Sequence, residues 1–202
     1  MPDTIPALVA HRAGEPADVL RLGSRPRPEP GEGQVLVRVS AAPVHATDLH
    51  IMRGRYGYTP EFPTVLGSES VGVVEAVGPD VDTLEDGQRV VTVLVTGTWR
   101  ELVVVAASQA IPAPDELSDS AACQLITNPL TALLVVREIG IRPGEWPLET
   151  AAGSTVGELV VQLARHRNIP TINVVRRRAA VDEIRQCGAP QPHRQWCCHH
   201  SP

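Results

Sequence analysis

The sequence contains no lysine, because all 18 of its basic residues are arginine. Catalysis through a lysine Schiff base is therefore excluded. No run approaches the roughly 18 consecutive apolar residues of a membrane-spanning helix. The four cysteines do not have the spacing of a disulfide framework. The formal net charge of −5 argues against a general role at nucleic acid or at a membrane surface.

The N-terminal residues lack the basic and then apolar layout of a secretory signal peptide. Together with the cysteine pattern, this favours a reduced, cytoplasmic setting. The 202 residues, of which 43% are hydrophobic and 20% charged, can form a real core in one large domain or two small ones.

Residues 1–115 have the pattern of an all-β unit. Residues 34–40 alternate apolar and polar side chains, as a half-buried strand does. Further β-branched runs occupy 71–77, 89–95 and 102–105, and turns rich in glycine and proline separate them. We expect these runs to form strands of one β domain.

Helical spacing begins after residue 118. Residues 119–125 and 130–139 predict two helices, with Ser118 as an N-cap and Gly140 as a stop. A link rich in proline and glycine then leads to a short apolar strand. That strand contains Pro147, which is unusual because proline lacks the N–H that a central strand donates.

Residues 150–175 have the order of a dinucleotide-binding βαβ unit. A turn of small residues is followed by an amphipathic helix over 158–166 and an apolar strand over 171–175. Such a turn lets backbone N–H groups approach a pyrophosphate at the start of the helix. The glycine-rich pattern is degenerate, because its three positions hold Ala152, Ser154 and Gly157.

Three arginines, Arg176, Arg177 and Arg178, follow the second strand of this unit. An acidic residue at this position would bind a ribose 2′-hydroxyl, whereas arginine accommodates a 2′-phosphate. The triplet therefore predicts NADP(H) as the cofactor. The alternative is an ordinary α/β segment that ends in an exposed basic turn.

The last residues, 190–202, show no apolar periodicity where a third strand would be expected. Cys197, Cys198, His199 and His200 could suggest a metal site, but four adjacent side chains do not easily converge on one tetrahedral ion. A reading-frame slip or a truncation explains this change in composition better. We expect an aberrant, disordered tail and no metal.

The chain resembles the medium-chain dehydrogenase/reductase superfamily over residues 5–189. Within it, the chain is similar to the zinc-free branch, near trans-2-enoyl thioester reductases and quinone oxidoreductases. The resemblance implies a GroES-like, partly open β-barrel over 1–115 and an incomplete Rossmann domain over 116–189. The landmarks, in chain order, are residues 12–20, 43–48, 54–56, 62–72, 97–99, 128–132 and the cofactor run.

The resemblance also implies the roles of single residues. In zinc-free enoyl reductases, a tyrosine that matches Tyr56 donates the proton to the substrate, and Tyr58 is the alternative donor. A phenol suits this role, since its ordinary pKa of about 10 keeps it protonated at neutral pH. The other interpretation of Tyr56 is a packed ring on the surface of the β unit.

The family's Asn-Pro-x-Thr-Ala landmark implies that Asn128 touches the nicotinamide half of the cofactor. Asn128 also suits a helix N-cap in front of a proline, which is favourable by itself. By the same resemblance, Gly153, Ser154, Thr155 and Val156 face the pyrophosphate.

Zinc-dependent alcohol dehydrogenases of the same superfamily are the competing class. A catalytic zinc needs three protein ligands and one open position. Here His45 and Ser68 stand where those enzymes have cysteine and histidine, and the third ligand is replaced near Thr127. Glu69 matches their Gly-His-Glu motif, and a metal held by His45 and Glu69 is the weaker alternative. The resemblance therefore implies chemistry without zinc.

The expected function is NADPH-dependent reduction of the C=C bond of an α,β-unsaturated carbonyl, with a 2-enoyl thioester as the preferred substrate. The expected partners are a small molecule and, in a full-length family member, a second subunit of a homodimer. We expect this chain by itself to be inactive. A non-catalytic fragment, or a GroES-like interaction module, is the alternative outside enzymology.

Overall fold

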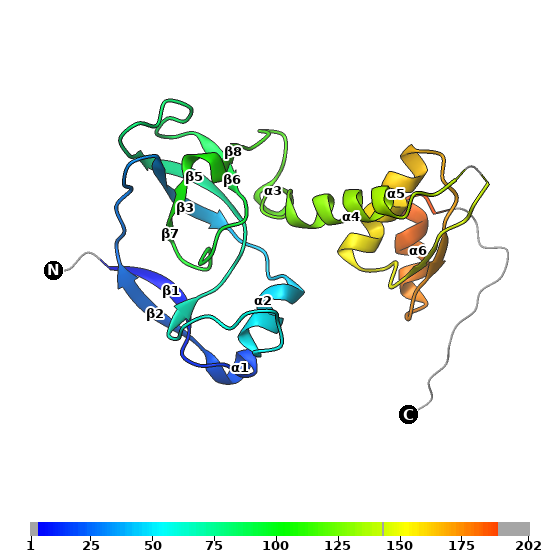
Figure 1. Cartoon of the computed structure of the whole chain (residues 1–202), viewed down its shortest axis with the longest axis horizontal. Coiled ribbons are helices and arrows are strands. Elements are labelled where there is room, and N and C mark those ends of the chain that lie inside the picture. Colours follow the sequence, from blue (N-terminus) through cyan, green and yellow to red (C-terminus); the bar gives the residue numbers. More distant parts are fainter. Residues whose placement is uncertain (1–3, 143, 190–202) are drawn as a thin grey trace. The chain divides into compact units, whose positions relative to one another are not determined.

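The computed structural model describes residues 4–142 and 144–189, so the expected tail over 190–202 lies outside the described residues. The chain divides into two compact units, Met1–Leu125 and Ile126–Pro202 (Figure 1). Residues 116–125, which the sequence pattern assigns to the nucleotide-binding part, cluster with the first unit. Among the described residues, no helix has the length and apolar character needed to cross a bilayer.

Two antiparallel sheets form the first unit. The strand order is β2-β1-β4 in one sheet and β7-β3-β5-β6-β8 in the other, so both sheets have open edges among the described strands. The strands are β1 (Thr4–Ala10), β2 (Leu20–Pro26), β3 (Gln34–Ala41), β4 (Thr64–Val65), β5 (Ser70–Val77), β6 (Arg89–Thr92), β7 (Leu102–Ala106) and β8 (Ala110–Pro112).

Short helical segments lie between these strands or, in the last case, after them. They are α1 (Pro16–Val19), α2 (Ala46–Met52), the 3-10 turn η1 (Ala107–Gln109) and α3 (Asp119–Ala122). The predicted N-cap of α3 is confirmed, because the Ser118 hydroxyl accepts a hydrogen bond from the Ala121 N–H at 3.4 Å.

Alternation of side chains builds the core of the first unit. In β1, the inward positions Ile5, Ala7 and Val9 are buried, while the residues between them are exposed. In β3, Val35 and Val37 belong to a second apolar cluster, while Leu36 between them is also buried, in a cluster with Ile5 and Leu102. β1 thus shows the period-2 pattern of a half-buried strand, whereas β3 has apolar neighbours on both of its faces.

The second unit is a βαβ arrangement with a preceding helix. Its elements are α4 (Thr127–Glu138), β9 (Leu148–Thr150), α5 (Thr155–His166), β10 (Ile172–Val174) and α6 (Ala179–Gln186). β9 and β10 pair in parallel, with Leu148 opposite Ile172. Pro147 lies just before β9, and its carbonyl accepts a hydrogen bond from the Ile172 N–H at 2.9 Å. The proline is therefore compatible with the strand, because it needs to donate no ladder bond.

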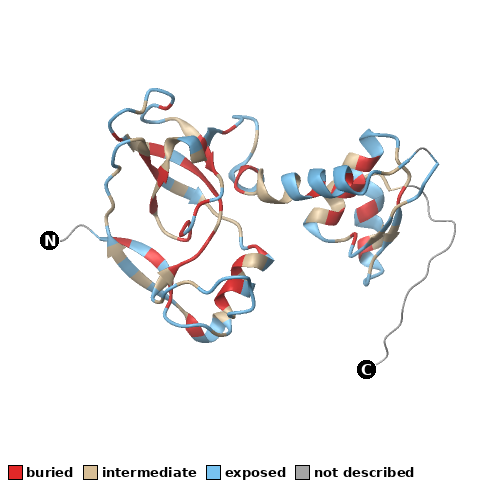
Figure 2. Ribbon diagram, in the orientation of Figure 1, coloured by how far each residue is buried: buried red, intermediate tan, exposed pale blue. Residues whose placement is uncertain are grey.

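The helices of this unit pack through small and branched side chains. Ala132 and Val136 of α4 meet Val160 of α5 in one cluster. Val161 of α5 meets Ile184 of α6 in another. In Figure 2, parts of the ribbon of these helices are coloured as buried. Gly140 follows α4 with a φ of 59°, which confirms the predicted stop.

Candidate functional site

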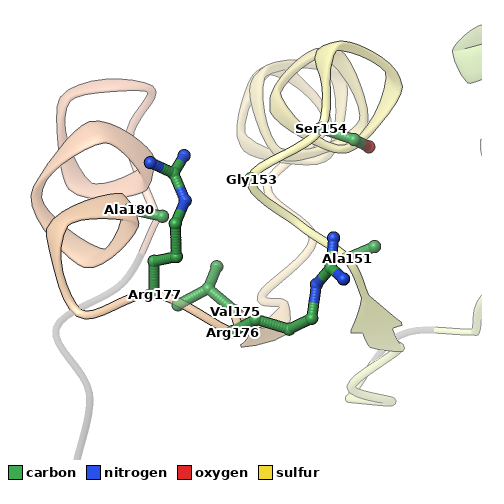
Figure 3. Close-up of a pocket in the computed structure, with 7 residues that line it drawn as sticks. All are labelled: Ala151, Gly153, Ser154, Val175, Arg176, Arg177 and Ala180. Atoms are coloured by element: carbon green, nitrogen blue, oxygen red, sulfur yellow. The ribbon is translucent and has the colours of Figure 1, made fainter.

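A pocket of about 380 Å³ lies in the second unit, where both parallel strands end (Figure 3). The turn after β9 forms one of its sides, and the segment after β10 forms another. Its lining residues are Ala151, Gly153, Ser154, Val175, Arg176, Arg177 and Ala180. The carboxyl ends of neighbouring parallel strands are the usual ligand position in an open α/β sheet.

The turn after β9 is held by hydrogen bonds at both of its ends. The Ala152 N–H donates to the Val174 carbonyl of β10 at 3.2 Å. The Ser154 hydroxyl caps α5 by accepting from the Gly157 N–H at 3.2 Å. Because α5 begins at this turn, its first N–H groups and its dipole favour an anion at the pocket.

Gly157 allows the turn to lie directly against α5. A Cβ atom at this position would stand 2.5 Å from the Ala152 carbonyl oxygen, which is closer than real Cβ contacts. Ala152 itself is fully buried. The one glycine retained from the degenerate pattern is thus required by close packing between turn and helix.

Two of the three predicted arginines line the pocket. In Figure 3, Arg176 extends toward Ala151, whereas Arg177 extends past Ala180. Arg177 has Glu183 at 4.0 Å, a distance at which the pair is weak because both side chains are more than half exposed. Arg178 is the N-cap residue of α6, and it is not among the residues that line the pocket.

The pocket residues fit a phosphate-bearing ligand. Small side chains at Ala151, Gly153 and Ala180 leave backbone groups accessible, and Arg176 and Arg177 place two guanidinium groups at the rim. Arginine binds phosphate through two parallel N–H donors. Ala151, Val175 and Ala180 were not predicted from the sequence as lining residues, because only the pairing of β9 with β10 brings them together.

The remaining predicted cofactor residues lie elsewhere in the second unit. Thr155 is the first residue of α5, and Val156 packs against the cluster between α4 and α5. Neither of them lines the described pocket. Asn128 is half-buried and lies inside α4, whose N-cap is Ile126. The alternative of Asn128 as an N-cap is therefore wrong, because the helix starts at Thr127 and takes the proline into its first turn.

Tyr56 belongs to the first unit, in the loop that follows α2. Its side chain is 52% exposed, and its ring meets that of Tyr58 edge to face at a centroid distance of 6.3 Å. An exposed phenol has the access that a proton donor requires. Its role as a donor stays a prediction.

A buried polar pair lies in the first unit at the start of α2. The Nε2 atom of His45 and the Oε1 atom of Glu69 are 2.7 Å apart, and the side chains are 9% and 1% exposed. The His45 N–H donates to the Asp48 carboxylate at 2.9 Å, and the Thr98 hydroxyl donates to the Glu69 carbonyl at 3.0 Å. His45 is thus fixed through its ring and through its backbone.

Burial dominates the electrostatics around this pair. It raises the pKa of Asp48 above its ordinary value, against the lowering effect of the hydrogen bond from His45. Burial, together with the charge of Glu69, also raises the pKa of the Cys123 thiol. Within residues 4–142 and 144–189, no three histidine, cysteine or carboxylate side chains form a group that could hold a metal ion.

Known proteins resemble this chain in sequence and in structure. The alcohol dehydrogenase GroES-like domain family matches residues 31–115. The mitochondrial enoyl-[acyl-carrier-protein] reductase of Xenopus tropicalis is 34% identical over 188 residues, which cover 90% of this chain and 54% of that protein. The reductase of the same name from Arabidopsis thaliana is 37% identical over 182 residues, or 89% of this chain and 48% of that protein.

Solved structures show the same relationship. A quinone oxidoreductase of Pseudomonas syringae has a TM-score of 0.84 at 29% identity, over 92% of this chain and 57% of that one. A mycobacterial protein solved in complex with NADPH has a TM-score of 0.83 at 30% identity, over 91% of this chain and 57% of that one.

The GroES-like domain match over residues 31–115 and these relatives support the medium-chain dehydrogenase/reductase superfamily for this chain. Its particular likeness is to enoyl-[acyl-carrier-protein] reductases and quinone oxidoreductases. The predicted fold class, a GroES-like β unit followed by an incomplete Rossmann unit, is confirmed. The chain spans about half the length of the curated relatives it matches, 54% and 48% for the two named above.

Proposed function

We propose that the chain supplies the GroES-like part and the phosphate-binding part of an NADPH-dependent reductase. Its substrate class is an α,β-unsaturated carbonyl, with a 2-enoyl thioester preferred, and the reaction reduces the C=C bond. The observation that carries the proposal is the position of Arg176 and Arg177 beside the small-residue turn at the start of α5. A site with two cations and a helix N-terminus selects a ligand with more than one phosphate group.

The comparisons support the substrate class and the cofactor. Both relatives named above carry the name enoyl-[acyl-carrier-protein] reductase, and a structural neighbour was solved in complex with NADPH. Under this proposal, the turn over 151–154 holds the pyrophosphate, and the two arginines hold the 2′-phosphate of the adenosine ribose. Thr155, Val156, Arg178 and Asn128 remain proposed contacts of the same cofactor.

In such a reaction, the bound NADPH supplies a hydride to the β-carbon of the double bond. The chain's own contribution is to bind, to orient and to donate a proton. The phenol of Tyr56 donates its proton to the α-carbon and stabilises the enolate that develops there. The side chain is accessible for this role, with 52% of its surface exposed.

The proposed reaction needs no metal. His45, in place of a zinc-ligand cysteine, is engaged with Glu69 at 2.7 Å. A zinc-type alcohol dehydrogenase is therefore the less supported candidate. For the full-length family member, we keep the homodimer as part of the proposal.

The test uses two preparations. The chain itself is titrated with NADPH and with NADH, and tighter binding of NADPH is expected. A chimera in which this chain replaces the matching half of the Xenopus relative is then assayed with a crotonyl thioester, a quinone and a simple alcohol. NADPH-dependent reduction of the thioester supports the proposal. Alcohol oxidation that EDTA abolishes would overturn it, and equal affinity for both cofactors would remove the assignment to NADPH.

A further inference from the structure

Two polar side chains occupy the centre of the parallel strand pair from which the pocket is built. Glu149 is the middle residue of β9, and Asn173, directly opposite in register, is the middle residue of β10. Both are half-buried, whereas Leu148 and Ile172 on the other face are exposed. Residues opposite each other in a ladder share a face, so the two side chains are neighbours.

Each of these side chains contains a buried oxygen atom without a hydrogen-bond partner. Among the described residues, neither the Glu149 Oε2 atom nor the Asn173 Oδ1 atom has one. The other end of the Asn173 amide is engaged, because its Nδ2 atom donates to the Thr171 hydroxyl at 2.9 Å. Two neighbouring acceptors without a donor leave both oxygens desolvated, which is costly.

A single proton resolves this conflict. Burial raises the pKa of the Glu149 carboxyl to about 7, and burial is the only cause of that shift. The strands β9 and β10 carry no other titratable group. None of the ionisable side chains on the three helices contributes to this pKa shift. Glu158 is half-buried, and the others are exposed: Arg137, Glu138, Arg165, His166, Asp182, Glu183 and Arg185.

We propose that Glu149 in its protonated form donates a hydrogen bond to the Asn173 Oδ1 atom, and that this bond positions the two sides of the cofactor pocket. β9 leads directly into the turn at Ala151, and β10 leads through Val175 into Arg176. The bond between the strands therefore sets the separation of the turn from the arginines. Glu149 and Asn173 are positioning residues, and this role rests on the proposed binding of NADPH.

The experiment measures NADPH affinity of the chain between pH 6 and pH 8 for wild type and for Glu149→Gln. If only the protonated form binds well, wild-type affinity should fall about tenfold over this range. The amide of the glutamine variant donates at every pH, so its affinity should stay high and change much less. Glu138→Gln, which removes an exposed carboxylate of the same unit, is the matched control and should behave as wild type.

A second measurement works without the cofactor. Because the pKa of Glu149 is raised in the folded state from 4.5 to about 7, the stabilisation is fully present below pH 4.5 and is lost as pH rises through 7. The urea midpoint of the second unit should therefore fall between pH 6 and pH 8 in wild type and stay nearly level in Glu149→Gln. Combining Asn173→Leu with Glu149→Gln should remove the higher urea midpoint that the glutamine variant has at pH 8.

The outcomes separate this inference from the proposed function. If NADPH does not bind at any pH while the urea midpoints behave as described, the proposed function fails and the hydrogen bond stands. If wild type and Glu149→Gln share one pH profile in both measurements, the inference is overturned. Affinity or stability that rises with pH would also overturn it, because the Asn173 amide would then donate to an ionised Glu149.

Discussion

At the scale of single residues, we expect the two arginines at the pocket to set the choice of cofactor. Arg176→Ala combined with Arg177→Ala should weaken NADPH binding far more than NADH binding. Charge-assisted hydrogen bonds contribute about 1.5–3 kcal/mol each, so every lost contact should cost about tenfold or more in affinity. Calorimetric titration with both cofactors measures the difference.

Arg137→Ala is the matched control, because Arg137 is an exposed arginine of α4 in the same unit and does not line the pocket. It should change NADPH affinity little. An equal loss of NADPH and NADH binding in the double variant would show that the arginines act as general surface charge, with a modest effect that salt removes.

The role of Tyr56 can be tested in the chimera with the Xenopus relative. Tyr56→Phe should lower turnover by about 10²–10⁴-fold, because general acid catalysis acts in the transition state. NADPH affinity should stay nearly unchanged. Tyr58→Phe tests the alternative donor, whose ring lies edge to face on that of Tyr56, and it should leave turnover nearly unchanged. Unaltered turnover in Tyr56→Phe would leave the ring with a packing role only.

The buried pair of the first unit affects stability. His45→Ala should lower the free energy of unfolding by about 3 kcal/mol, because it removes a partner of a buried carboxylate. Glu69 is 1% exposed, so water cannot easily replace the imidazole. Urea denaturation measures the loss. The double variant His45→Leu with Glu69→Leu should lose less free energy of unfolding than the sum of the losses in the two single leucine variants. Strict additivity would argue against an energetic coupling between His45 and Glu69.

At the scale of elements, the contact between the turn and α5 depends on one glycine. Alanine normally stabilises a helix relative to glycine by about 1 kcal/mol. Gly157→Ala should instead destabilise the second unit by about 1–3 kcal/mol, because the new Cβ would stand 2.5 Å from a backbone oxygen. Thermal unfolding followed by circular dichroism measures the change.

Gly57→Ala serves as a comparison, because nothing lies within 4 Å of the position of its added Cβ. It should leave the unfolding temperature nearly unchanged. A neutral or stabilising effect of Gly157→Ala would show that the turn can move away from α5.

Local sequence patterns predicted the type of each helix and strand better than they predicted where the elements begin and end. The alternation over 34–40 and the spacing over 158–166 gave the right element types, because side-chain periodicity follows directly from backbone geometry. α4 begins at Thr127, earlier than the apolar spacing indicated. Its first turn is polar and contains a proline, so periodicity alone could not reveal it.

At the scale of the whole molecule, cofactor binding should act on one of the two compact units. Saturation with NADPH should protect backbone amides of the turn over 151–154 and of the start of α5 from hydrogen exchange. Binding to the folded state alone stabilises it by about 2.7 kcal/mol at a ligand concentration 100-fold above Kd. Exchange followed by mass spectrometry measures this. Protection confined to residues 4–125 would contradict the assignment of the phosphate site to the second unit.

The sequence by itself determined the class of fold and the order of the cofactor unit. These depend on local features: apolar alternation, turn residues and the run from the small-residue turn to the arginines. The collinear landmarks indicate the family. The tertiary structure decided which of these residues meet. His45 faces Glu69 across 24 positions of the chain, and Glu149 faces Asn173 through strand register. A shift of one residue in register would turn either strand side chain to the opposite face, and no local pattern specifies that choice.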